Sequence, residues 1–118
     1  IKGCELGAST SCYNAGLMHW SGFKAPRQPQ TALAWFAKGC ELKSAASCAG
    51  AAIASYSANP EPREAALAQS RRWLDYARSL DAANPLVQAI DDWLREGANP
   101  EGAPAIPAPG STSLEQQT

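Results

Sequence analysis

A five-residue block that recurs in this chain constrains its fold more than any other feature. Residues 2–6 read Lys-Gly-Cys-Glu-Leu, and residues 38–42 read the same, 36 positions later (38 − 2). The same offset matches further pairs: Ser11 with Ser47, Cys12 with Cys48, Leu17 with Ile53, and Trp20 with Tyr56. Sequence periods of roughly 20 to 50 residues indicate stacked repeats, each of which is one supersecondary unit.

The spacing of small and apolar residues within each copy is helical. Residues 30–43 carry Leu33, Phe36 and Cys40 on one helical stripe. Ser44 is a good N-cap, Pro62 fits the first turn of a helix, and Gly97 fits a helix end. The pattern predicts five helices, at residues 11–21, 30–43, 45–57, 62–81 and 85–96, with a residual helical turn before them.

The copies differ in completeness, which predicts the domain organisation. Residues 62–81 resemble a diverged copy of 30–43 in which Arg78 stands at the place of Cys40. The last helix has one apolar and one polar face, as the cap of a stack does. We therefore expect one domain over residues 1–97, with about two recognisable repeats, a degenerate third and a capping helix. Ile1 corresponds to Ala37, late in a helix, so we expect the natural chain to extend upstream.

The segment after the capping helix differs in composition from the rest. Residues 98–118 are rich in Pro, Ala, Gly and Ser and have almost no large apolar side chains. Such a segment cannot compensate for the entropy of ordering it, so we expect a disordered tail.

Four cysteines, Cys4, Cys12, Cys40 and Cys48, form two pairs with the same spacing of eight. Four cysteines allow three pairings, and the equal spacing makes Cys4–Cys12 and Cys40–Cys48 the simplest. Buried thiols that act as small hydrophobic groups are the alternative. A zinc set of Cys4, Cys12 and His19 lacks the usual ligand spacing. Because structural disulfides persist in oxidising compartments, we expect a periplasmic or secreted protein.

Charge and composition exclude several classes of function. The formal net charge is −1, from 10 basic and 11 acidic residues, whereas capture of nucleic acid requires a basic face. No apolar run reaches the length of a membrane span. A single histidine, with no acid–base pair at usable spacing and no phosphate or metal motif, leaves little to carry out chemistry. We therefore expect no catalytic residue, no metal and no cofactor.

Three blocks of the sequence resemble a known family. They are the Lys-Gly-Cys-Glu-Leu block, residues 11–18, and residues 32–42, and they look like Sel-one-like repeats of the cysteine-rich bacterial subgroup. The resemblance covers residues 1–56 well and 62–80 weakly. It implies an α/α solenoid, a short superhelix of helix-turn-helix repeats related to tetratricopeptide repeats, that serves as a non-enzymatic protein-binding scaffold. It also implies disulfides Cys4–Cys12 and Cys40–Cys48, each joining the second helix of one repeat to the next repeat.

In that family the first helix of each repeat lines the concave face, and the resemblance extends this role to specific residues here. The candidate contacts for a protein or peptide partner are Tyr13, Asn14, Leu17, His19, Trp20, Ser55 and Tyr56. Aromatic side chains mixed with amides suit protein recognition. The competing interpretation is that Trp20 and Tyr56, at equivalent positions, belong to the core.

Two further patterns point to other functions. Ser21-Gly22-Phe23-Lys24 matches the Ser-x-x-Lys motif of penicillin-recognising enzymes, and the cysteine-rich subgroup has been associated with β-lactams. The alternative function is therefore β-lactam binding or hydrolysis, although Ser-Asp-Asn and Lys-Thr-Gly do not occur. Arg71, Arg72 and Arg78 would suit an acidic partner, or form a solvated helix face. A metal or haem carrier that uses the cysteines and His19 is a third hypothesis.

Overall fold

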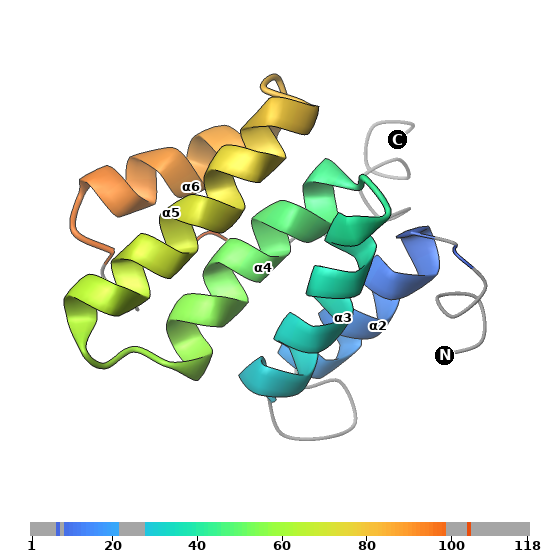
Figure 1. The fold of residues 1–118 in the computed structure, drawn as a ribbon, viewed down its shortest axis with the longest axis horizontal. Helices are drawn as coiled ribbons and strands as arrows, with labels where there is room; N and C mark the ends of the chain where they lie inside the picture. The colour runs from blue at the N-terminus through green and yellow to red at the C-terminus, as the bar shows by residue number, and fades with distance from the viewer. Residues whose placement is uncertain (1–6, 8, 22–27, 99–103, 105–118) are drawn as a thin grey trace, which may run out of the picture.

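The chain folds into α-helices throughout the part that the structure describes. The computed structural model describes residues 7, 9–21, 28–98 and 104 (Figure 1). Within these residues there are five helices and no strand: α2 (Ser9–Ser21), α3 (Pro29–Glu41), α4 (Ala45–Ala58), α5 (Arg63–Leu80) and α6 (Pro85–Arg95). The predicted all-α class is confirmed, and each helix lies within two residues of its predicted bounds. The predicted residual turn lies outside the described residues.

The helix boundaries follow from local sequence signals. The Ser44 hydroxyl accepts a hydrogen bond from the Ser47 amide at 3.2 Å, and the Asn84 side chain accepts one from the Leu86 amide at 2.9 Å. Both contacts satisfy amide groups that the first turn of a helix leaves without a partner. Pro62 occupies the N-cap of α5, one residue before its first turn. Gly97 has a φ of 104°, as a glycine that ends a helix does.

Helix α4 is the centre of the fold. Figure 1 shows α4 between α3 and α5, and these two helices make its most extensive contacts. Helices α2 and α6 also contact α4, but make no extensive contact with each other. Every residue of α4 from Ser47 to Tyr56 is buried. The small side chains of this helix, most of them alanine, are what allow several helices to approach it closely.

One aromatic side chain fills the space that these small residues leave. Phe36 of α3 is fully buried. A Cβ atom added to Gly16 of α2 would lie 2.7 Å from the Phe36 ring, and one added to Gly50 of α4 would lie 2.9 Å from it. Tyr13 packs at a centroid distance of 5.8 Å on the same ring. Phe36 therefore joins α2, α3 and α4, and only glycine fits opposite it.

A disulfide joins the end of α3 to the start of α4. Cys40 and Cys48 are bonded, with their Cα atoms 4.6 Å apart, and both side chains are buried. The turn between them places Lys43 at a φ of 72°. This is one of the two predicted bridges. The other, Cys4–Cys12, cannot be followed because Cys4 lies outside the described residues.

Polar contacts attach α5 to its neighbours. The Ser70 hydroxyl donates to the Ala52 carbonyl of α4 at 2.7 Å. Arg63, the first residue of α5, donates to the Tyr56 hydroxyl at 3.3 Å and to the Gly97 carbonyl after α6. Tyr56 in turn packs edge-on against Trp93 of α6, at 5.4 Å between ring centroids. The start of α5 is thus tied to both α4 and the end of α6.

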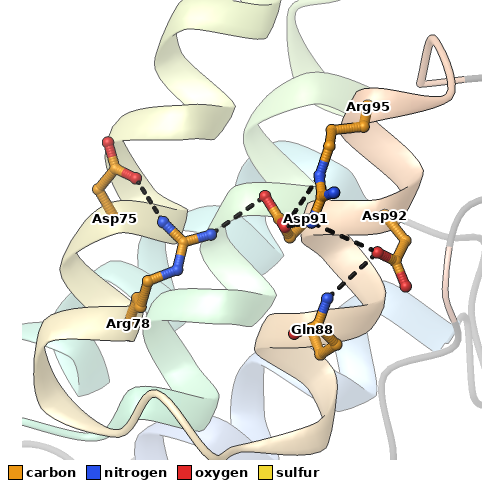
Figure 2. Close-up of polar contacts among 6 residues, drawn as sticks. All are labelled: Asp75, Arg78, Gln88, Asp91, Asp92 and Arg95. Carbon is orange, nitrogen blue, oxygen red and sulfur yellow. Dashed lines mark hydrogen bonds and ion pairs between the residues drawn. The ribbon is translucent and has the colours of Figure 1, made fainter.

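An ion-pair network links the exposed sides of α5 and α6 (Figure 2). Arg78 pairs with Asp75 on its own helix and with Asp91 on α6, each at 3.1 Å. Arg95 pairs with Asp91 and Asp92. Its hydrogen bond to Asp91 is the main reason that the pKa of Asp91 lies below its ordinary value of 3.8, and the positive charges of Arg95 and Arg78 lower that pKa further.

We expect Asp91→Asn to lower the free energy of unfolding by about 0.5–1 kcal/mol at neutral pH, since the Arg78 side chain is 42% exposed and water screens the pair. Because the folded protein lowers the pKa, the carboxylate stabilises the fold above pH 3.8. That contribution disappears as the pH falls through the lowered value. Urea unfolding at several pH values tests this.

The control for this prediction is Asp92→Asn, because Asp92 pairs with Arg95 within α6. It should change the stability less than Asp91→Asn does. A stability difference between wild type and Asp91→Asn that did not shrink at acidic pH would contradict the electrostatic explanation.

The structure also bears on the ends of the predicted domain and on membrane insertion. Ala98, which the sequence places in the tail, is buried, and its amide donates to the Trp93 carbonyl at 2.9 Å. Pro104 is half-buried, and the rest of the predicted disordered tail lies outside the described residues. Among the helices described, none has the length and apolar character needed to cross a bilayer.

Candidate functional site

A groove runs between α3 and α5 and has α4 as its floor. Its volume is about 330 Å³. It is lined by Leu33 of α3, Ser55 of α4, residues Asn59 and Glu61 of the connection to α5, and Ala65, Ala66, Gln69 and Trp73 of α5. Figure 1 shows the two helices that form its walls on either side of α4. Helices α3 and α5 make no extensive contact with each other, so the space above α4 stays open.

Helical spacing explains how α5 forms its wall of the groove. Ala65, Gln69 and Trp73 follow one another at intervals of four, which places them on one face of the helix. Ala66, Ser70, Leu74 and Ala77 lie beside that face and are buried. The side chain that lines the groove is small near the start of α5, at Ala65, and large at Trp73. Across the groove, Leu33 of α3 is half-buried.

The chemical character of the groove suits binding more than proton transfer. Leu33 and Trp73 provide half-buried apolar surface, and Asn59 and Gln69 provide exposed amides. Glu61 is the one ionisable side chain among the lining residues. The Ser55 hydroxyl donates to the Ala52 carbonyl at 3.1 Å, within its own helix. The backbone of α4 thus holds the Ser55 hydroxyl on the floor of the groove.

A basic side chain from the turn between α3 and α4 contacts α5 beyond Trp73. The Lys43 ammonium donates to the hydroxyl of Tyr76 at 3.2 Å and lies 5.9 Å from the centre of its ring. Tyr76 is three residues after Trp73, and 38% of it is exposed. One turn beyond Trp73, α5 therefore carries an exposed aromatic side chain in contact with a positive charge from the turn that follows α3.

The predicted contact residues do not form one exposed surface. Tyr13, Trp20 and Tyr56 are all buried in the hydrophobic core, which is the competing interpretation that the sequence left open for Trp20 and Tyr56. Burial also raises the pKa of Tyr13 to about 12. Asn14 is exposed, while Leu17 and His19 are half-buried. Ser55 alone lines the groove, from the floor. A protein-binding role for this set remains a prediction.

The other sequence patterns have the following places in the fold. Ser21 ends α2, and the remaining residues of the Ser-x-x-Lys match lie outside the described residues. Arg71 and Arg72 are exposed on α5, whereas Arg78 belongs to the ion-pair network. In the part of the chain that the structure describes, no three His, Cys, Asp or Glu side chains gather as a metal site would require.

The groove itself was not predicted from the sequence. Its walls are α3, the second helix of one repeat copy, and α5, which belongs to the degenerate copy. The sequence had instead predicted a contact surface on the helices that correspond to α2 and α4. The spacing of Ala65, Gln69 and Trp73 was a usable signal. Comparisons of the chain with protein-family models, with curated proteins and with solved structures found no match. The case for a function therefore depends on the residues and geometry of this chain.

Proposed function

We propose that this protein is a non-enzymatic scaffold that binds another protein or peptide in the groove between α3 and α5. The observation that carries the proposal is the groove itself: an open hollow with two large apolar side chains, Leu33 and Trp73, on facing walls. Large, partly exposed aromatic side chains are enriched among residues that dominate binding energy. The groove is at the lower end of the size range of ligand pockets, which suits one or two anchoring side chains of a partner.

The polar residues of the groove support a peptide ligand. The Asn59 and Gln69 amides each offer a donor and an acceptor, as a peptide backbone requires. A second hollow, lined by Gln28, Pro29, Gln30, Thr31, Ser57 and Ala58, has no large apolar side chain to anchor a partner. We therefore assign the partner to the groove.

The proposal extends to family and compartment. The helical pairs, the recurring block and the Cys40–Cys48 bridge support a short Sel-one-like repeat solenoid in which a disulfide joins successive repeats. A structural disulfide also supports a function in the periplasm or outside the cell. The alternative β-lactam activity is tested by a turnover assay with a chromogenic β-lactam, in which we expect no hydrolysis above background.

We expect Trp73→Ala to weaken peptide binding at least about thirtyfold, because truncation of an aromatic anchor typically costs about 2 kcal/mol or more. The probes are twelve-residue peptides selected from a random display library on the wild-type protein. Their dissociation constants for wild type and variant are then measured by fluorescence anisotropy. The thermal melt of the variant separates lost binding from lost folding.

Trp35→Ala is the matched control for this experiment. Trp35 is half-buried on α3, and it is not among the residues that line the groove. Its truncation should leave the peptide affinities within about twofold, a change of about 0.4 kcal/mol. Affinities that depend on Asn14 and His19 but not on Trp73 would instead place the contact surface on α2, and would overturn the assignment to the groove.

A further inference from the structure

The two ends of the groove between α3 and α5 carry charges of opposite sign. Helix α4 runs antiparallel to both of its neighbours, so α3 and α5 run in the same direction on either side of it (Figure 1). The connection from α4 to α5 therefore lies at one end of the groove, and the turn from α3 to α4 lies at the other. The first end holds the exposed carboxylate of Glu61. The second end holds the exposed ammonium group of Lys43.

Helical spacing places Tyr76, the residue that Lys43 contacts, on the side of α5 that lines the groove. Each residue of an α-helix is rotated by about 100° from the one before, so Tyr76 lies about 20° around the helix from Ala65, and Gln69 lies about 40° from it. Ala65 and Gln69 both line the groove. The hydrogen bond of 3.2 Å therefore ties the Lys43 ammonium to this side of α5. It does so about 4.5 Å along the helix axis beyond Trp73.

A second cation lies on the same side of α5. Arg72 is exposed, and it lies about 20° around the helix from Ala65, in the opposite sense from Tyr76. The neighbouring Arg71 lies about 100° farther round, away from the groove. Within the described residues, the ion pairs of this protein involve neither Arg72 nor Lys43. No carboxylate of that part of the chain therefore neutralises the two cations.

The backbone of the turn fixes the position of Lys43. This residue follows the C-cap of α3 and has a φ of 72°, in the left-handed region where a helix end usually has glycine. Its amide donates to the Cys40 carbonyl at 2.9 Å, and the Cys40–Cys48 disulfide closes the turn. Glycine adopts this conformation without the strain that a Cβ atom adds. The turn alone thus favours glycine, and the lysine is better explained by what its side chain contacts.

The charged ends are separated by the length of a short extended peptide. From Ala65 to Tyr76, α5 rises by about 16 Å, since each residue adds about 1.5 Å. An extended chain adds about 3.3 Å per residue, so this length corresponds to about five residues. Trp73 lies about 12 Å from Ala65 by the same measure, which corresponds to about four residues. A ligand side chain held against Trp73 is therefore near the Lys43 end and about four residues from the other end.

We propose that the partner of the groove is an extended peptide segment with charged residues of opposite sign on the two sides of one apolar anchor. The anchor lies between Leu33 and Trp73. An acidic residue, one or two positions from the anchor, pairs with Lys43 and Arg72. A basic residue, about four positions away on the other side, pairs with Glu61. This inference rests on the proposed function and adds which peptides the groove selects, because charge complementarity contributes to specificity more than to affinity.

Peptide selection on the intact chain tests the proposal. Twelve-residue peptides are selected from a random display library on the wild-type protein, and their affinities are measured by fluorescence anisotropy at low ionic strength. We expect the peptides whose binding depends on Trp73 to share the acidic–apolar–basic pattern, in either chain direction. Replacing the acidic residue of such a peptide by glutamine should weaken binding about two- to fivefold, as the loss of an exposed ion pair does.

Variants of the protein assign the charges to their residues. Lys43→Gly suits the left-handed turn, so its thermal melt should not fall. Its affinity for the acidic peptides should fall about two- to fivefold, and the glutamine peptide should then bind as well as its parent. Glu61→Gln should act in the same way on the basic residue of the peptide. Arg72→Gln should also weaken binding, whereas Arg71→Gln removes the same charge one position away and should leave the affinities unchanged.

The remaining outcomes overturn the proposal in distinguishable ways. Peptides that depend on Trp73 but share no charge pattern would contradict this inference and leave the proposed function in place. Absence of any peptide that depends on Trp73 would overturn both. Acidic peptides that bind Lys43→Gly as tightly as wild type would show that the cation of the turn does not pair with them. Equal losses from Arg71→Gln and Arg72→Gln would show an effect of net charge and no contact in the groove.

Discussion

Replacing Phe36 by alanine is expected to lower the free energy of unfolding by about 3–5 kcal/mol, the largest single effect in this protein. The ring is fully buried and touches Gly16 of α2 and Gly50 of α4 at the same time. Because both neighbours are glycines on packed helices, neither of them has a side chain that can move into the space. A domain of this size is stable by about 5–15 kcal/mol, so the variant loses a large part of its stability.

Urea unfolding followed by circular dichroism measures this loss. The control is Trp35→Ala, which removes a larger but half-buried side chain next to Phe36 and should cost less. A second variant tests the contact from the other side. Gly50→Ala brings a methyl group to 2.9 Å from the ring, and overpacking of this kind costs about 1–3 kcal/mol.

Phe36→Leu should compensate in part for Gly50→Ala, because the smaller side chain leaves room for the methyl group. A double-mutant cycle over these two positions is expected to show coupling, as residues in contact do. Strict additivity of the two changes would contradict the role of Phe36 as the residue that joins the three helices.

Removing the Cys40–Cys48 bridge is expected to lower the free energy of unfolding by about 2–3 kcal/mol. The chain-entropy estimate for so short a loop is near 2.5 kcal/mol, because an unfolded chain without the bond has more conformations. The double variant Cys40→Ala, Cys48→Ala is the right comparison, since a single replacement leaves a reactive thiol. Thermal and urea unfolding of the double variant against wild type give the magnitude.

Peptide mapping under non-reducing conditions tests the pairing itself. We expect the peptides that contain Cys40 and Cys48 to be linked, as in the structure, and those that contain Cys4 and Cys12 to be linked, as the sequence predicts. A crossed pairing, or a double variant as stable as wild type, would contradict the structural role assigned to the bridge.

Local sequence signals are sufficient to place the five helices of the described residues. Their positions depend on local signals: the apolar stripe of Leu33, Phe36 and Cys40, the caps Ser44 and Asn84, and the terminating Gly97. Each of these signals acts within one or two helical turns. The residues that place a helix are therefore all close to it in the sequence. The equal spacing of the cysteines likewise predicted the bridge that the structure contains.

Which surfaces of the helices are covered depends on how the helices pack, and local sequence signals do not show it. An apolar stripe shows that a face is buried, but it does not show which helix buries it. Trp20 and Tyr56 were equally suited to a groove and to a core, and the packing of α4 placed both in the core. The groove at Leu33 and Trp73 exists because α3 and α5 both pack on α4 and not on each other. That arrangement depends on contacts between segments about 40 residues apart (73 − 33), for which periodicity within a single helix carries no information.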